Sequence, residues 1–124
     1  MNISKFTQKS VQAVQDLEKV AYEYGNQEVE QEHLLYALLT QEDSLILKLI
    51  EKMDINKEYF INVVKKALDA KVKVSGGDLR FGQYLNKSLV NAENEAKAMG
   101  DEYVSVEHLF LSLLTNVFLA VPIY

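Results

Sequence analysis

Residues 100–109 read GDEYVSVEHL, and residues 25–34 read GNQEVEQEHL, a related stretch that lies 75 positions earlier. Shifting the sequence by that distance aligns residues 6–40 with residues 81–115, and 12 of the 35 aligned pairs are identical. The identities cluster in one pattern, G-x3-V-x2-E-H-L-x3-L-L-T, which indicates an internal duplication. We call residues 6–40 the first copy and residues 81–115 the second copy.

Each copy is predicted to form a long helix, a short loop and a second helix. Apolar residues recur along both long helices at the spacings of one, three and four that are typical of an amphipathic helix. They are Ala13, Val14, Leu17, Ala21 and Tyr24 in the first copy and Leu85, Leu89, Ala92, Ala96 and Met99 in the second. Gly25 and Gly100 follow these stripes, at the place where a helix commonly ends on a residue that tolerates positive φ.

Polar residues at the predicted helix starts are suited to helix capping. Thr7 can accept a backbone hydrogen bond at the start of the first helix, which is predicted from about residue 7 to residue 24. Ser105 can do the same for the last helix, where Glu107 falls in the first turn beside the positive end of the helix dipole. Glu30 takes the corresponding position in the first copy and is a poorer cap.

Two further helices are predicted between the copies, at residues 44–53 and 57–70. Their inward-facing residues, by helical phase, are Ile46, Leu49, Ile50, Met53, Phe60, Val64, Ala67 and Leu68. Residues 71–81 break the helical pattern and contain Ser-Gly-Gly-Asp at 75–78, so they are interpreted as a flexible linker. Val72 and Val74 alternate with lysines there and also fit a short extended piece.

These elements indicate one all-α domain over residues 1–124. Repeat one covers residues 1–70, the linker residues 71–81, a partial repeat two residues 82–115 and a divergent apolar tail residues 116–124. A single repeat cannot bury its apolar stripe alone, so we expect the two repeats to pack against each other around a pseudo-two-fold axis.

The composition excludes several classes of protein. With 48% apolar residues in 124, the chain can bury a core, and the absence of cysteine excludes disulfides, thiolate metal sites and a cysteine nucleophile. The net charge of −5 leaves no basic stripe for nucleic acid. The sequence has no apolar run long enough to span a bilayer, and its start lacks the apolar region of a secretory signal, so we expect no membrane partner and a cytoplasmic location.

The repeated pairs Glu32-His33 and Glu107-His108 are the first candidates for chemistry. Adjacent helical positions point about 100° apart, whereas zinc ligands on a helix lie at i and i+4, as in H-E-x-x-H. Neither copy has a second histidine, so each histidine is interpreted as packed and hydrogen-bonded near a helix start. A small metal-dependent hydrolase that uses His33 and His108 is the alternative.

Other catalytic patterns point the same way. No serine lies in a G-x-S-x-G elbow, and Gly76-Gly77 is not followed by the Gly-Lys-Ser/Thr of a Walker phosphate loop. Glu28 and Glu30 are interpreted as solvated charges. We therefore expect a binding module and not an enzyme, with no cofactor and no metal held by this chain.

The duplicated E-H-L-x3-L-L motif, the Ser-Gly-Gly linker and the stretch GDEYVSVEHL resemble the Clp N-terminal repeat domain, in the form carried by ClpB disaggregases. The resemblance covers residues 1 to about 115. It implies an eight-helix domain of two four-helix repeats, attached flexibly ahead of two AAA+ ATPase modules in a hexameric machine. ATP and Mg would be bound only by those modules. The domain itself would engage exposed apolar segments of unfolded or aggregated proteins.

The resemblance also implies functional residues. A threonine early in the first helix, an aspartate after the second glycine, the glutamate of the S-x-E motif and a leucine of the client groove are implicated in that family. The predicted substrate-protein binding residues are Thr7, Phe81, Leu85, Leu89, Asp101 and Glu107. The alternative within the family is a ClpC-like or ClpA-like domain that docks a folded adaptor.

The sequence departs from the family pattern after Thr115. Two further helices would follow there, whereas this chain reads NVFLAVPIY and stops, so the second repeat is expected to be incomplete. We hypothesise that the chain self-associates through the face that those helices would cover. A monomer mass in light scattering at high concentration would refute this.

Overall fold

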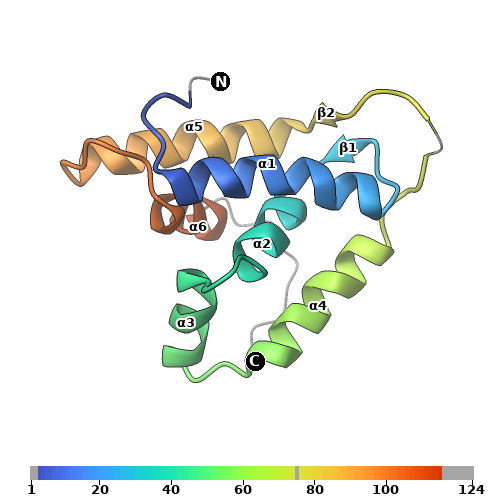
Figure 1. The fold of residues 1–124 in the computed structure, drawn as a ribbon, viewed down its shortest axis with the longest axis horizontal. Helices are drawn as coiled ribbons and strands as arrows, with labels where there is room; N and C mark the ends of the chain where they lie inside the picture. Colours follow the sequence, from blue (N-terminus) through green and yellow to red (C-terminus); the bar gives the residue numbers. More distant parts are fainter. Residues whose placement is uncertain (1–2, 75, 116–124) are drawn as a thin grey trace.

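The computed structural model describes residues 3–74 and 76–115, which form six helices and two very short strands (Figure 1). In chain order the elements are α1 (Gln8–Glu23), β1 (Glu28–Val29), α2 (Gln31–Leu39), α3 (Leu45–Lys52), α4 (Lys57–Asp69), β2 (Arg80–Phe81), α5 (Gln83–Ala98) and α6 (Val106–Thr115). The long helices α1 and α5 both have 16 residues, and their first residues are 75 positions apart. The first residues of α2 and α6 are also 75 positions apart. The all-α fold class predicted from the sequence is confirmed.

Helices α2 and α6 form the centre of the molecule, and each packs against the long helix of its own copy. Across the duplication the contacts are reciprocal, because α1 also packs on α6 and α5 also packs on α2. The helices of the intervening segment complete one side of the core, with α4 against α2 and α3 against both α2 and α6. The apolar stripes of both copies therefore share one core, which includes Leu17, Leu34, Leu89 and Leu109.

Two short backbone pairings join the two copies. Val29 pairs with Phe81 in the parallel strands β1 and β2, and Phe6 forms an isolated parallel bridge with Val104. Adding 75 to one member of each pair gives a member of the other, so the two pairings are equivalent. The backbone N–H of Gly82 donates to Val29 at 2.8 Å, and that of Thr7 donates to Val104 at 2.9 Å. This reciprocity establishes the pseudo-two-fold relation that the sequence predicted.

The same local chemistry ends both long helices. Gly25 has φ of 72° and Gly100 has φ of 74°, a region in which a side chain would strain the backbone. The next residue closes the turn in both copies: the N–H of Asn26 donates to Ala21 at 2.9 Å and that of Asp101 to Ala96 at 2.8 Å. The helix ends predicted from the two glycines are confirmed.

The other predicted boundaries agree with the structure to within a residue or two. Thr7 caps α1 by accepting from the N–H of Ser10, and Glu30 is the N-cap residue of α2. Ser44 and Asn56 cap the two intervening helices with their side chains. No strand is assigned at Val72 and Val74, although the backbone of this segment is hydrogen-bonded, as described below.

The prediction of inward-facing side chains is wrong for two residues. Met53 is 54% exposed and Met99 is 60% exposed. Each is the C-cap residue of its helix, where the chain leaves the helical path and the side chain extends past the packed neighbours. The predictions made for the tail at 116–124 lie outside the described residues. Within the described part of the chain, no helix has both the length and the apolarity needed to cross a membrane.

Candidate functional site

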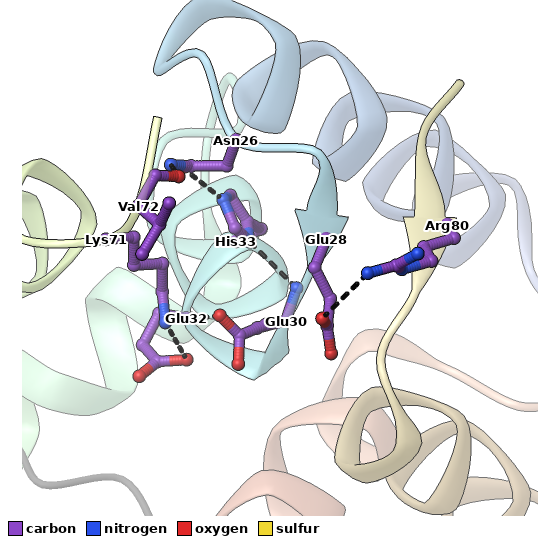
Figure 2. Close-up of polar contacts among 8 residues, drawn as sticks. All are labelled: Asn26, Glu28, Glu30, Glu32, His33, Lys71, Val72 and Arg80. Carbon is purple, nitrogen blue, oxygen red and sulfur yellow. Dashed lines mark hydrogen bonds and ion pairs between the residues drawn. The ribbon is translucent and has the colours of Figure 1, made fainter. Parts of the chain in front are cut away.

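The loop between α1 and α2 is organised around the buried ring of His33 (Figure 2). Its Nδ1 accepts a hydrogen bond from the backbone N–H of Glu30 at 2.8 Å, so the ring proton lies on Nε2. Nε2 then donates to Oδ1 of Asn26 at 2.9 Å. The imidazole therefore fixes both ends of the loop that leads from Gly25 into α2.

His108 makes the equivalent bonds in the second copy. Its Nδ1 accepts from the backbone N–H of Ser105 at 2.9 Å, and its Nε2 lies 2.9 Å from Oδ2 of Asp101. The partners of the two histidines are therefore matched position by position. Both rings have the structural role interpreted from the sequence, since each holds a loop against the start of a helix.

The His33 ring is neutral at neutral pH, as its two hydrogen bonds require. Burial, together with the nearby positive charge of Lys71, lowers its pKa from 6.5 to about 4. A metal ion at either histidine would have to displace one of the two ring hydrogen bonds. No group of three or more potential metal ligands occurs among residues 3–74 and 76–115.

A short segment at residues 71–74, which we call the strap, crosses the first-copy loop. Lys71 lies 2.8 Å from Oε2 of Glu30 and 3.3 Å from Oε1 of Glu32, and its side chain is only 15% exposed. Burial alone would lower the Lys71 pKa, but the hydrogen bond to Glu30 and the charges of both glutamates hold it above its ordinary value. Figure 2 shows this ammonium next to the glutamate carboxylates at the start of α2.

The strap is also joined to the loop through its backbone. The side-chain amide of Asn26 donates to the carbonyl of Val72 at 3.1 Å, and the N–H of Val74 donates to the carbonyl of Gly25 at 2.9 Å. Part of the predicted linker is therefore anchored to the first copy.

The side chain of Glu30 is 41% exposed, and its pairing with Lys71 was not predicted from the sequence. Glu28, paired at 3.9 Å with Arg80, is largely exposed, as expected. The alternation of valine and lysine was the sequence signal for the strap. That pattern did not predict which residues would contact it.

The strap accounts for the main difference between the two loops. Asn26 lies under it and is 3% exposed, whereas the side chain of Asp101 in the second copy is 52% exposed. No segment among the described residues covers Asp101 as the strap covers Asn26.

Two of the predicted binding residues meet in an open pocket of about 420 Å³. Thr7 and Glu107 line it from opposite copies, at the starts of α1 and α6. The start of α3 contributes Leu45, which is 41% exposed, and Val106 adds a second apolar side chain. Lys9 and Asp43 also line the pocket, which therefore combines apolar surface with hydroxyl, carboxylate and ammonium groups.

The other predicted residues lie elsewhere. Leu85 and Leu89 are fully buried on α5 and form part of the core, and Phe81 is half-buried in β2. Asp101 lies on the exposed loop described above. The structure thus brings Thr7 and Glu107 together and leaves the remaining four apart from that pocket, whose lining does not include them.

The family-wide comparison fits this architecture. The model of the Clp repeat (R) N-terminal domain matches residues 5–119. The chain belongs to this family. Among curated Clp relatives, the chaperone protein ClpB of Nitratidesulfovibrio vulgaris is 40% identical over 119 residues, which cover 92% of this chain and 14% of that protein. ClpB of Porphyromonas gingivalis is 38% identical over 116 residues, covering 94% of this chain and 13% of the relative.

Solved Clp-type N-terminal domains share the fold at low sequence identity. The Hsp104 N-terminal domain from Candida albicans has a TM-score of 0.82 at 19% identity, covering 91% of this chain and 75% of that one. The N-terminal domain of the ClpV1 ATPase from Escherichia coli has a TM-score of 0.82 at 21% identity, covering 92% and 70%. This chain spans about one seventh of the length of the curated ClpB proteins.

Proposed function

We propose that this chain is the accessory N-terminal domain of a ClpB-like AAA+ disaggregase and that it binds exposed apolar segments of unfolded or aggregated polypeptides. Its similarity to ClpB proteins over nearly the whole of its length supports the choice of machine. The hexameric ATPase, with its ATP and Mg, would then be contributed by other parts of the intact protein.

The observation that carries the proposed binding is the pocket between the two copies. Leu45 and Val106 give it an apolar floor, and Thr7 and Glu107 stand at its edge with groups that can bond to a peptide backbone. An open pocket of this kind contacts a few side chains at a time and is tolerant of their sequence. Weak and reversible binding suits a domain that must release its client to the ATPase.

Fluorescence anisotropy with labelled, unfolded casein tests this proposal. Leu45→Lys places a charge on the apolar floor and is expected to weaken binding about fivefold or more, a cost of about 1 kcal/mol. Met53→Lys is the matched control, because Met53 is also an exposed apolar side chain, at the other end of α3. The proposal fails if casein does not bind, or if both variants bind it as the parent does.

A second candidate is docking of a folded adaptor, as in a ClpC-like or ClpA-like unfoldase. The fold supports it as well, since the N-terminal domain of the chaperone ClpD from Arabidopsis thaliana, described as associated with caseinolytic protease, has a TM-score of 0.69 at 18% identity, covering 93% of this chain and 79% of that one. Titration with a folded Clp adaptor beside unfolded casein separates the two. Only the first function predicts affinity for a disordered chain.

A further inference from the structure

The interface between the two copies contains a buried polar pair that its pseudo-symmetry does not repeat. Gln31 of α2 donates its side-chain amide to the hydroxyl of Ser88 on α5, and both side chains are fully buried. The positions equivalent to this pair, 75 residues away in each case, are Val106 of α6 and Ala13 of α1, which are also buried. The interface therefore has a polar contact on one side and apolar side chains at the equivalent positions on the other.

This asymmetry selects which copies pair. Because the two copies fold alike, the first copy of one molecule has the general shape needed to pack on the first copy of another about a true two-fold axis. That pairing would place Ala13 opposite Gln31 on both sides of the axis, and a buried amide without its partner is destabilising. The first copy is therefore matched to the second copy, whether the two belong to one chain or to two.

The covalent connection between the copies is a thin one. Past the strap, the chain passes through Gly76, Gly77 and Asp78, which we call the crossing, on its way to β2 (Figure 1). All three residues are exposed, and both glycines have positive φ, 78° and 89°. A Cβ added at Gly76 would meet no atom within 4 Å, and one added at Gly77 would lie 2.9 Å from the side-chain amide of Gln27. The crossing therefore acts as a short tether whose turn requires glycine.

The contacts between the copies do not include the crossing. They are made by α1 with α6, by α2 with α5, by β1 with β2 and by the bridge of Phe6 with Val104. A second molecule of the chain carries the same surfaces and can supply either half of each contact. What favours closure within one molecule is the tether, which gives the two copies a high effective concentration as long as it can span the distance between them.

We propose that the two copies are exchangeable between molecules, so that a second copy of this chain is a partner for the first. When the crossing is too short to close, the first copy of one molecule packs on the second copy of another, and the reverse, in a reciprocal dimer. The contact of Gln31 with Ser88 is then formed twice, each time between chains. This dimer is distinct from self-association through an uncovered face, because it depends on the length of the crossing.

Deletion of Gly76 and Gly77 tests the role of the crossing. In size-exclusion chromatography with light scattering, the shortened chain should have twice the mass of the parent at the same concentration. Insertion of two further glycines after Gly77 is the matched control, and it should leave the mass of the parent unchanged. Equal masses for the three folded chains overturn the inference.

Cross-linking identifies which copies pair, because the chain has no cysteine of its own. Glu28 and Arg80 are exposed and lie opposite each other in β1 and β2. A shortened Glu28→Cys chain that is refolded together with a shortened Arg80→Cys chain should be joined to it by a short bismaleimide. Lys5 lies 75 positions before Arg80, so a mixture of Glu28→Cys with Lys5→Cys reports the pairing of two first copies and should give no product. Equal product from both mixtures overturns the proposed pairing.

A second measurement applies if the shortened chain does not fold. The same two mixtures, with the crossing at its full length, are unfolded in urea and refolded together at increasing concentration. Product from the Glu28→Cys and Arg80→Cys mixture that increases with concentration supports the exchange. Its absence at every concentration overturns the exchange.

Discussion

The two copies of the duplicated motif form nearly the same backbone, yet one loop is covered and the other is open. In the first copy the strap lies over the loop, and Lys71 is held by two glutamates. In the second copy the equivalent aspartate is exposed and the equivalent glutamate lacks a cation among the described residues. A duplicated fold can therefore keep its packing in both copies while the two equivalent loops differ in exposure.

The difference also separates two roles that the repeated motif combines. The histidine, the glycine and the leucines are retained in both copies because each loop must be closed against the start of a helix and buried in one core. The positions that differ, Asn26 and Asp101 or Glu30 and Ser105, are those that contact the strap or correspond to those that do. Glu32 and Gly25 also contact the strap and are identical in the second copy, so the two loops differ at some of the strap-contacting positions and match at others.

The largest expected effects test whether the two copies are equivalent in the core. Leu34 and Leu109 occupy matched positions on α2 and α6, and both are fully buried. Leu34→Ala and Leu109→Ala should each lower the free energy of unfolding by about 3–4 kcal/mol, measured by urea denaturation. Values that differ by more than about 1.5 kcal/mol would break the equivalence.

The next effect tests the buried ring of the covered loop. Because the folded-state pKa of His33 lies at about 4, below the ordinary 6.5, the unfolded chain takes up a proton first as the pH falls. The contribution of the neutral His33 ring to the free energy of unfolding is complete above pH 6.5 and is lost as the pH falls towards 4. The free energy of unfolding should be lower by about 2.5 kcal/mol at pH 4.5.

Urea midpoints at pH 7 and pH 4.5 measure this loss. His33→Gln removes the titrating group, so the unfolding free energy of that variant should depend less on pH over the same window. An unchanged slope would show that other groups control the acid sensitivity.

A smaller effect isolates the strap. Lys71→Met keeps most of the apolar stem and removes the charge, which leaves Glu30 and Glu32 facing each other without a cation. We expect a loss of about 1.5 kcal/mol in the free energy of unfolding, since the pair is only partly shielded from solvent. Lys66→Met on the exposed face of α4 is the control and should change stability by less than about 0.5 kcal/mol.

The smallest effect compares the two helix ends. Gly25→Ala and Gly100→Ala each place a side chain at positive φ and should each cost about 1 kcal/mol. An added Cβ at Gly25 would lie 3.8 Å from Cβ of Lys73, an ordinary contact, and at Gly100 it would meet no atom within 4 Å. Thermal unfolding of the two variants should therefore give similar shifts, and a much larger shift at Gly25 would mean that the strap is packed more tightly.

Much of the fold could be predicted from the sequence, because the duplication and the helical periodicity carry it. The glycines fixed the helix ends correctly, since positive φ is a local requirement of the chain. The methionines at the helix ends were placed wrongly, because periodicity continues through a C-cap while the backbone does not. Their exposure depends on where the neighbouring helix stops, which is a property of the tertiary structure.

The candidate site was less accessible to sequence reasoning. The pocket shared by Thr7 and Glu107 arises where three helix starts converge from distant parts of the chain, and helical phase cannot predict that meeting. The pairing of Lys71 with Glu30 and Glu32 likewise joins residues about 40 positions apart. Both features come from the way the copies and the strap pack. The binding roles of all six predicted residues, Thr7, Phe81, Leu85, Leu89, Asp101 and Glu107, remain predictions.

The exchange of backbone pairings between the copies has a consequence for synthesis on the ribosome. The hydroxyl of Ser10 donates a hydrogen bond to the carbonyl of Val104, 94 residues later in the chain. Phe6 forms its backbone bridge with the same residue. A growing chain cannot form these contacts until residue 104 has left the exit tunnel.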